Sequence, residues 1–457
     1  MKEQPDLHTY LNDLKKNHPR HMITFPNEVS RDFISTAVAL ELENLGLYPT
    51  LWFEKIQGFN QSLVANLFAS NDLLAYSIGV QPGEFNEVLG NCLDKLIPAK
   101  VVSNGPVHDV VWIGEEVDLY KLPIPQHFRD DAGQYITAGM VAARDPENGV
   151  GNLAYARLQI KDKRRMGVSL HSRQHLWDYQ RRAALAGKDL PVAVIIGAHP
   201  AVMIAAAAKM GMQDDEYDLA GALLKQPLTL CKGLTVDVNV PSNAEIVIEG
   251  VIKANEQETE GPFGEYTGYM TGRSTNNVME VTAITLRHDA IFVDIIPGNS
   301  SEHLTLGRAS KEAWIFKRMQ EALPFFRQFY YPSSGTHFHC YIQIEKTSDG
   351  QAKQAAQLLI GLDHYVKLAI VVDKDIDPTN ESMVMWAVAT RMQADRDASI
   401  ISGLMCNQLD PSSQGGIGAK MILDATRPID ATARRVELPA ESVIEAAKLL
   451  SSVGFNR

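Results

Sequence analysis

Glu260-Gly-Pro-Phe-Gly-Glu265, followed at once by Tyr266-Thr-Gly-Tyr269, is the stretch around which the rest of the chain is organised. Pro262 fixes its own φ and the two glycines permit a tight backbone path, so the segment predicts a compact turn and not a helix. The two carboxylates can then converge on one side of the turn. Such pairs tend to divide into a proton donor and a charged partner. The alternative is a solvated acidic turn, since an acidic run from Glu256 leads into it.

The composition is that of a globular protein with an ample core. Its 457 residues, 45% of them hydrophobic, correspond to about three domains. The net charge is −12 with acids and bases interspersed, which argues against a nucleic-acid or anionic-membrane partner. The four cysteines form no CxxC pair, as is typical of reduced thiols in a cytosolic protein. With neither a signal-peptide core nor an uninterrupted membrane-length apolar run, the expected location is the cytoplasm.

The pattern of elements divides the chain into regions and predicts an α/β (α+β) fold class. Residues 1–106 predict a small α/β domain, with a strand from Tyr48 to Phe53 and a helix from Ser62 to Ala69. Residues 107–325 carry many strands, among them Ala290 to Ile295, and few helices, which favours a barrel-like core. Residues 326–440 return to an α/β pattern. Residues 441–457 predict a terminal helix that could pack on a second subunit or on its own domain.

Three polar residues upstream of the turn could bind a metal ion. Asn152, His171 and Glu216 supply one amide oxygen, one imidazole and one carboxylate. This mixed set suits Mn²⁺ or Mg²⁺ better than a structural zinc, which prefers thiolates. Taken singly, each has a simpler interpretation: a turn cap, a satisfied core histidine and a helix-start residue. The residue types alone leave both interpretations open.

Six motifs occur along the chain in order. They are Asp130 to Thr137, Arg144-Asp-Pro146, Asn152 with Arg157, His171-x-Arg-Gln174, Glu216 with Gly221, and the turn from Glu260 to Glu265. This series resembles the signature of the UbiD-type decarboxylases, the family that includes ferulic acid decarboxylase. The likeness covers the chain from about residue 105 to 440, and six ordered motifs are far more specific than any single one.

The resemblance implies reversible non-oxidative decarboxylation of an aromatic, heteroaromatic or α,β-unsaturated carboxylic acid. The implied cofactor is prenylated FMN, with its phosphate held through Mn²⁺ (or Mg²⁺) and K⁺. Arg157, Glu260 and Glu265 would form a catalytic Glu–Arg–Glu network in which Glu265 donates the proton. The metal ligands would be Asn152, His171 and Glu216. The implied cofactor lining, partly through backbone groups, comprises Thr137, Asn152, Tyr155, Ala156, Arg157, Leu170, His171, Ala206, Ala207, Ala208, Lys209 and Glu216.

The resemblance also implies an architecture and partners. The central region, 107–325, would be a split β-barrel that binds the flavin, and residues 326–440 would be an oligomerisation domain followed by the terminal helix. The expected partners are a small carboxylic acid substrate, a flavin prenyltransferase that supplies the cofactor, and further copies of the chain in a homodimer or homohexamer. The rival function is a non-catalytic flavin-binding or scaffold subunit of a larger carboxylase complex, for which Arg157, Glu260 and Glu265 would have no use.

Substrate selection has less support in the sequence. The segment from Pro297 to Arg308 follows a strand and precedes a helix, which predicts a loop lining the pocket. There His303 and Arg308 could hold a ring heteroatom or a second carboxylate, and the alternative is a surface loop. A heteroaromatic acid, such as a furan or pyrrole carboxylate, is the first candidate. His337 and His339 are expected to alternate on a strand face and to be structural.

Overall fold

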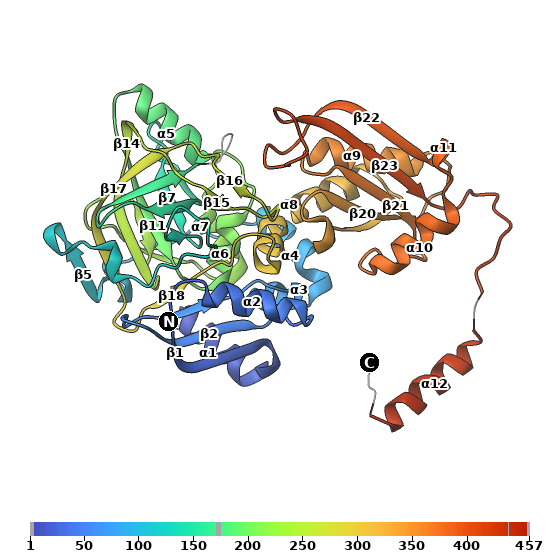
Figure 1. Cartoon of the computed structure of the whole chain (residues 1–457), viewed down its shortest axis with the longest axis horizontal. Coiled ribbons are helices and arrows are strands. Elements are labelled where there is room, and N and C mark those ends of the chain that lie inside the picture. The colour runs from blue at the N-terminus through green and yellow to red at the C-terminus, as the bar shows by residue number, and fades with distance from the viewer. Residues whose placement is uncertain (1–3, 171–174, 437, 455–457) are drawn as a thin grey trace.

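The computed structural model describes residues 4–170, 175–436 and 438–454. Figure 1 shows two lobes: the N-terminal and central regions form the larger one, and a C-terminal α/β unit forms the other, with the last helix standing apart from both. Within the described part of the chain, no helix combines the length and the apolar content needed to cross a bilayer. The predicted α/β (α+β) fold class is confirmed.

The N-terminal region packs short helices around a four-stranded sheet with the order β1-β2-β3-β18. The helices are α1 (Leu7–Asn17), α2 (Ile34–Asn44), α3 (Asn71–Tyr76) and α4 (Phe85–Leu93), and the strands are β1 (Met22–Val29), β2 (Thr50–Ile56), β3 (Ser62–Ala65) and β18 (Ile291–Val293). The predicted helix from Ser62 to Ala69 is wrong. Its first half is β3, because Leu63 and Val64 are buried between β2 and β18, and a short apolar run fits either period. The segment around β18 was expected in the barrel, but it joins this sheet in parallel.

The central region is built on a nine-stranded curled sheet with the order β6-β9-β10-β17-β14-β11-β7-β8, and β5 pairs with β17 outside this path. The strands are β5 (Val110–Ile113), β6 (Tyr135–Ile136), β7 (Met140–Arg144), β8 (Gly151–Tyr155), β9 (Arg157–Ile160), β10 (Arg165–Ser169), β11 (Leu190–Ile196), β14 (Ile246–Gln257) and β17 (Asn277–Leu286). The path is open between β6 and β8, so the sheet is a half-barrel. The barrel-like core predicted from the strand-rich pattern is confirmed in this form.

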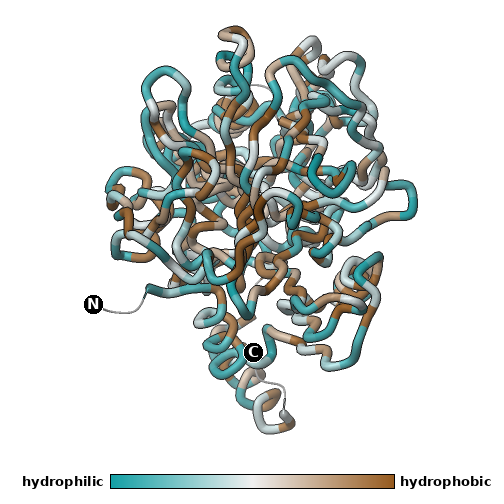
Figure 2. Tube along the Cα trace, turned by 90° about the vertical axis from the view of Figure 1, so that its left-hand side faces the viewer, coloured by the Kyte–Doolittle hydropathy of each residue, from teal (hydrophilic) through white to brown (hydrophobic). Residues whose placement is uncertain are grey.

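Both faces of the curled sheet are buried. Along β11, Val192 and Val194 pack into one apolar cluster, whereas Ala193 and Ile195 pack into another, as the two-residue period of a strand requires. Figure 2 shows hydrophobic segments concentrated in the interior and hydrophilic ones in the outer loops. The helices of this region are α5 (His175–Leu185), α6 (Pro200–Ala207) and α7 (Glu216–Leu224).

Two small sheets and several single turns complete the central region. One sheet has the order β13-β12-β4, and the other is the hairpin of β15 and β16 that carries the second half of the acidic turn. Their strands are β4 (Lys100–Val101), β12 (Thr229–Lys232), β13 (Asn239–Pro241), β15 (Phe263–Gly264) and β16 (Met270–Thr271). Single 3₁₀ turns of the chain lie at Pro19–His21, Pro82–Glu84, Pro106–His108, Gly114–Glu116, Leu119–Lys121 and Ser333–Gly335.

Helix α8 (Ser301–Ala322) leads from the central region into the C-terminal lobe. That lobe is a five-stranded sheet with the order β19-β20-β21-β23-β22, and α9 and α10 cover its opposite faces. Its elements are β19 (Phe326–Tyr330), β20 (His339–Ile344), α9 (Gln351–Leu362), β21 (Leu368–Asp373), α10 (Glu381–Arg391), α11 (Ala394–Asp397), β22 (Ala398–Met405) and β23 (Ile417–Ala425).

The predicted terminal helix is present as α12 (Ala440–Ser452), and every residue of it is exposed. The expected loop from Pro297 to Arg308 ends early, because Ser300 caps α8 with its side chain and the helix begins at Ser301. The expected strand placement of His337 is also wrong, since β20 begins only at His339. The domain borders at residues 106, 325 and 440 stay predictions.

Candidate active site

Arg157 holds the two carboxylates of the acidic turn together. It is the first residue of β9, and its Nε and Nη2 lie 3.0 and 2.8 Å from the Oε1 and Oε2 of Glu260. Its Nη1 lies 2.5 Å from Oε1 of Glu265. The Glu260 side chain is fully buried, and those of Arg157 and Glu265 are about nine-tenths buried at 11% and 10% exposure. The predicted convergence of the two acids is therefore present, with an arginine fork between them.

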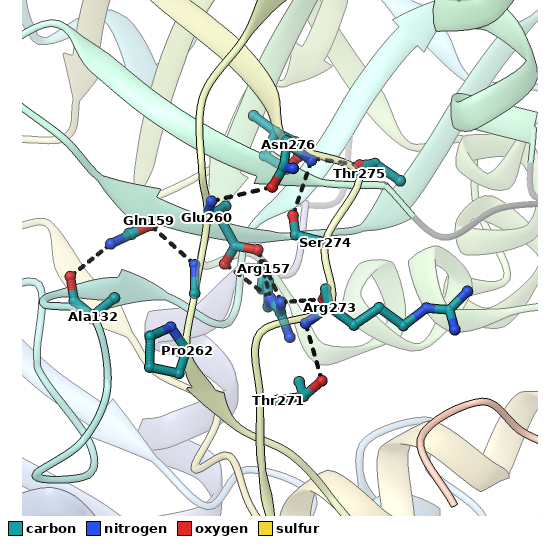
Figure 3. Close-up of polar contacts among 12 residues, drawn as sticks. Ala132, Arg157, Gln159, Glu260, Pro262, Thr271, Arg273, Ser274, Thr275 and Asn276 are labelled. Carbon is teal, nitrogen blue, oxygen red and sulfur yellow. Dashed lines mark hydrogen bonds and ion pairs between the residues drawn. The ribbon is translucent and has the colours of Figure 1, made fainter. Parts of the chain in front are cut away.

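The surroundings of the guanidinium explain its orientation. Burial alone would lower the pKa of Arg157, but the hydrogen bonds and charge of Glu260, with Glu265 adding to them, raise it overall. The guanidinium also stacks over the ring of Phe263 at 5.0 Å, and Nη2 donates to the backbone carbonyl of Arg273 at 2.8 Å. Figure 3 shows this carbonyl turned toward Arg157 while the side chain of Arg273 points away.

The turn itself is clamped from the segment that contains the motif Asp130 to Thr137. Asp131 accepts from the backbone N–H of Gly264 at 2.9 Å, and Ala132 donates its N–H to the carbonyl of Pro262 at 2.8 Å. Gln159, two residues after Arg157 on β9, accepts from Gly261 and donates to Ala132 (Figure 3). The turn is therefore hydrogen-bonded to β9, the same strand that carries Arg157. These hydrogen bonds were not predicted from the sequence, because a bond to a backbone N–H or C=O group does not depend on the residue type at that position.

The pair Asn152 and Glu216 lies elsewhere on the half-barrel. Asn152 is on β8 and Glu216 begins α7, and both are buried. The Nδ2 of Asn152 lies 3.1 Å from each carboxylate oxygen of Glu216, which also accepts from the N–H of Leu153 at 2.7 Å. Burial raises the pKa of Glu216 to about 8, although these hydrogen bonds oppose the rise. His171, the third predicted ligand, lies outside the described residues.

This pair fits the oxygen side of a hard divalent-cation site. The Oδ1 of Asn152 is buried and has no hydrogen-bond partner among the described residues, and the Glu216 carboxylate is within reach of the same amide. An amide oxygen and a carboxylate oxygen are ligands that Mn²⁺ and Mg²⁺ accept. Within residues 4–170, 175–436 and 438–454, no cluster of three or more His, Cys, Asp or Glu side chains has metal-binding geometry.

The remaining predicted lining residues lie on several elements of the same half-barrel. Thr137 uses its hydroxyl fully: it donates to Asp294 at 2.8 Å and accepts from the N–H of Ile295 at 3.2 Å. The buried hydroxyl of Tyr155, by contrast, has no partner in the described structure. Ala156, Leu170 and Ala206 are buried, and Ala207 and Ala208 are half-buried. Lys209 is exposed and lies over the ring of Trp314 at 4.3 Å.

The two predicted substrate residues differ in their surroundings. His303 lies in the first turn of α8, where its Nδ1 is 3.1 Å from the carbonyl of Gly298 and burial lowers its pKa, opposed by the charge of Glu265. Arg308 is buried, and its guanidinium already has three partners. These are the carbonyl of Tyr331 at 2.7 Å, Asn71 at 3.3 Å and Glu312 at 3.4 Å. His303 is therefore beside the acidic turn, while Arg308 is tied to the frame around α8.

Two residues that were not assigned to the site lie beside it. Tyr266 directly follows Glu265, and its ring packs edge-on against His303 at 6.1 Å and against His337 at 4.8 Å. The contact between Tyr266 and His337 was not predicted, because His337 was interpreted as part of a strand face in the C-terminal domain. The sequence feature that could have indicated otherwise is the irregular segment from Tyr331 to Phe338 before β20.

Two regions of the chain match known protein families. Residues 100–300 match UbiD, described as the 3-octaprenyl-4-hydroxybenzoate carboxy-lyase Rift-related domain, and residues 304–425 match the C-terminal domain of that carboxy-lyase. A Bacillus subtilis (strain 168) protein named phenolic acid decarboxylase is 32% identical over 450 residues. The matched part spans 93% of this chain and 93% of that protein.

Solved structures extend the likeness to three dimensions. The UbiD-class enzyme HmfF from Pelotomaculum thermopropionicum, in complex with FMN, superposes with a TM-score of 0.92 at 37% identity, covering 97% of this chain and 100% of that one. An evolved dimeric form of HmfF in complex with prFMN gives a TM-score of 0.87 at 35% identity, covering 96% and 98%. The likeness thus includes both lobes of the molecule.

Proposed function

Because the chain belongs to the UbiD family of carboxy-lyases, we propose that it catalyses the reversible, non-oxidative decarboxylation of an aromatic, heteroaromatic or α,β-unsaturated carboxylic acid with prenylated FMN. The observation that carries this proposal is the pair of buried carboxylates on one arginine fork, Glu260 and Glu265 on Arg157. A scaffold subunit has no use for two carboxylates and an arginine buried together, because such groups are costly to desolvate.

The flavin would occupy the half-barrel between this network and the metal pair. Two features support the fit: the run Ala205 to Ala208 offers small side chains, and the unpartnered Tyr155 hydroxyl offers a hydrogen bond. Asn152, Glu216 and His171 would bind Mn²⁺ (or Mg²⁺), which with K⁺ would hold the phosphate. When bound, the cofactor supplies the electron sink for the charge that remains after CO₂ leaves.

Proton transfer in the reaction is assigned to the acidic turn. In the decarboxylation direction the bond between the substrate carbon and the carboxylate carbon breaks. The carboxylate leaves as CO₂, and the substrate carbon that carried it then takes a proton. Glu265 is the proposed donor, because it reaches the arginine fork through one oxygen and keeps the other for the reacting carbon. Arg157 then stabilises the carboxylate that Glu265 becomes, while Glu260 keeps the guanidinium oriented through two hydrogen bonds.

Selection of the substrate is proposed to involve α8. His303 faces the acidic turn and can contact the acid directly, whereas Arg308, with its three partners in the protein, is proposed to act by holding α8 in place. His303→Ala should therefore change the ranking of substrates, and Arg308→Ala should lower activity on all of them.

Assembly into a homodimer or homohexamer is also proposed, since α12 has no buried residue and exposes Val443, Ile444, Leu449 and Leu450. The evolved dimeric form of HmfF shows that a relative can associate. Light scattering after size-exclusion chromatography of the full chain, with and without residues 440–457, measures this directly.

The decisive experiment replaces Glu265 with Gln in protein produced together with a flavin prenyltransferase. The amide keeps the shape of the side chain but has no proton to give, so CO₂ release should fall by at least about 10²-fold, while the flavin absorbance stays at the parent level. Turnover of the Gln variant at the parent rate would remove Glu265 from the mechanism. Absence of turnover by the flavin-loaded parent with every acid in a broad panel would favour the scaffold function.

A further inference from the structure

We propose that the ring of Phe128 sets the separation between the turn that carries Glu265 and the start of α8 that carries His303, which makes Phe128 a positioning residue for the reaction. The inference rests on the proposed function, in which Glu265 donates the proton and His303 contacts the acid. The sequence gives Phe128 no motif of its own, and its place is visible only in the fold.

The ring of Phe128 lies between two glycines that belong to different segments. A Cβ added to Gly264 would lie 2.5 Å from the Cδ2 of Phe128, and one added to Gly298 would lie 2.6 Å from its Cζ. Apart from the adjoining residues, the three nearest heavy atoms in each case belong to this ring. Neither position has room for a side chain, so the ring packs directly on the backbone of both segments.

Each of the two glycines adjoins a group to which the proposed reaction gives a role. Gly264 directly precedes Glu265 in the chain. The carbonyl of Gly298 lies 3.1 Å from the Nδ1 of His303, and Ser300, two residues after this glycine, caps α8. A shift of either glycine therefore changes the distance between the carboxylate of Glu265 and the imidazole of His303.

Side chains on either side of Phe128 bind it to the same two segments. The Oδ2 of Asp131 accepts from the N–H of Phe128 at 2.8 Å, and its Oδ1 accepts from the N–H of Gly264 at 2.9 Å. The Nε2 of His127 lies 2.9 Å from the Oδ1 of Asp294, the residue after β18, and both of these side chains are fully buried. One carboxylate thus holds the ring against the acidic turn, and one His–Asp pair holds it against the segment that leads to α8.

The contribution of the ring can be separated from that of the hydrogen bonds. Phe128 makes its bonds through the backbone, donating its N–H to Asp131 and accepting at its carbonyl from the amide of Gln126 at 3.0 Å. Replacement of the side chain leaves these groups in place and removes only the ring. A leucine is smaller than the ring, and closely packed surroundings respond to such a loss of volume by shifting into it.

The first test measures the kinetics of Phe128→Leu in the full chain produced with a flavin prenyltransferase, with cinnamic, 4-hydroxybenzoic and 2-furoic acid as probes. We expect kcat to fall about tenfold on each acid that the parent decarboxylates, with KM changed by less than about threefold, because displacement of a proton donor acts on the reacting step. The matched control is Phe25→Leu, since Phe25 is also half-buried but stacks on Phe53 in the N-terminal sheet. This control should keep both kcat and KM.

The second test asks whether the ring and the glycine act on each other. Gly264 lies in the strand β15, so alanine fits its backbone and the Phe128 ring is what excludes it. Gly264→Ala alone should lower kcat more than about tenfold, and the addition of Phe128→Leu should raise kcat at least about fivefold above that of Gly264→Ala, because the smaller side chain makes room for the methyl group. Gly272→Ala, whose Cβ meets open space, should leave the effect of Phe128→Leu unchanged.

Amide hydrogen exchange supplies a readout that does not depend on turnover. Gly264→Ala should speed exchange at residues 297–304 as well as in the acidic turn, because the displaced ring presses on Gly298. The effect at residues 297–304 should disappear when Phe128→Leu is also present, and Phe25→Leu should affect neither segment. Phe128→Met, which is closer to phenylalanine in volume, replaces Phe128→Leu in every arm if the leucine variant does not fold.

The outcomes separate this inference from the proposed function. A double variant no more active than Gly264→Ala, a loss in Phe128→Leu that is confined to KM, or faster exchange that stays within the acidic turn would each overturn the role of Phe128 and leave decarboxylation intact. A flavin-loaded parent that releases CO₂ from none of a broad panel of acids would overturn the proposed function, and with it the role of Phe128 in the reaction. The exchange experiment would still decide whether the ring couples the two segments.

Discussion

Replacement of Arg157 with Lys tests whether the arginine fork, and not only its positive charge, is required. Arg157 donates to Glu260 from two nitrogens, to Glu265 from a third and to the carbonyl of Arg273. A single ammonium group cannot span two carboxylates in this way. Hydrogen bonds to charged groups contribute about 1.5–3 kcal/mol each.

The loss of two such bonds, with partial compensation by the lysine charge, should cost about 3 kcal/mol in the transition state. Since about 1.4 kcal/mol corresponds to a factor of ten, kcat/KM should fall on the order of 100-fold. The assay is CO₂ release by protein loaded with flavin, with flavin absorbance recorded for each preparation so that occupancy is known.

Arg273→Lys is the matched control. Arg273 is exposed, it contributes only its backbone carbonyl to the network, and its side chain points away from Arg157 (Figure 3). This variant should keep kcat/KM within about threefold of the parent. If Arg157→Lys also stayed within threefold at full flavin occupancy, charge alone would suffice and the argument from fork geometry would be refuted.

Three further predictions address the supports of the site. Glu216→Ala should lose flavin and manganese together, as measured by absorbance and metal analysis, whereas Asp214→Asn should keep both; retention of flavin without metal would contradict the bridging role. Gly264→Ala should lower activity more than tenfold, because the added Cβ would lie 2.5 Å from the Phe128 ring, and Gly272→Ala, which meets open space, should not. The hydrogen bonds of Asp145 to Arg182 lower the pKa of Asp145 from 3.8, so this ion pair should stabilise the fold above about pH 4 and lose its contribution as pH falls through the folded pKa. The Tm of Asp145→Asn should therefore lie below that of the parent at neutral pH, and the difference between the two Tm values should shrink as pH is lowered. A difference in Tm that does not change with pH would show that the ion pair does not cause it.

The sequence predicted best where one local rule was decisive. Proline and glycine forced the turn at Glu260 to Glu265, and strand-rich patterning indicated the half-barrel. It failed where two periods fitted one short apolar run, as at Ser62 to Ala69, and where the cap at Ser300 started α8 earlier than the hydrophobic pattern suggested. The pairing of β18 with β3 could not be read locally, because the two strands are more than 200 residues apart and meet only in the fold.

Site residues divide in the same way. The charged groups to which a chemical role is proposed, such as Arg157 and Glu260, were identifiable from the acidic turn and from the ordered motifs that resemble those of the family. The groups that position them bind backbone atoms of the turn, as the Asp131 carboxylate does when it accepts from the N–H of Gly264. Residue type alone does not predict such contacts.

The hydrogen bonds that hold the acidic turn explain how the proposed acid–base site can be built on a loop. A loop alone would let Glu265 move relative to the strand that carries Arg157, and small displacements weaken proton transfer steeply. Here Gln159, on that same strand, bonds to Gly261, and Asp131 bonds to Gly264, so both ends of the Gly-Pro-Phe-Gly segment are fixed to the half-barrel. The carboxylate of Glu265 is then held against Arg157 at 2.5 Å by a turn that is itself fixed. The half-barrel therefore fixes the relative positions of Arg157, Glu260 and Glu265, because one strand carries both Arg157 and the Gln159 that holds the turn.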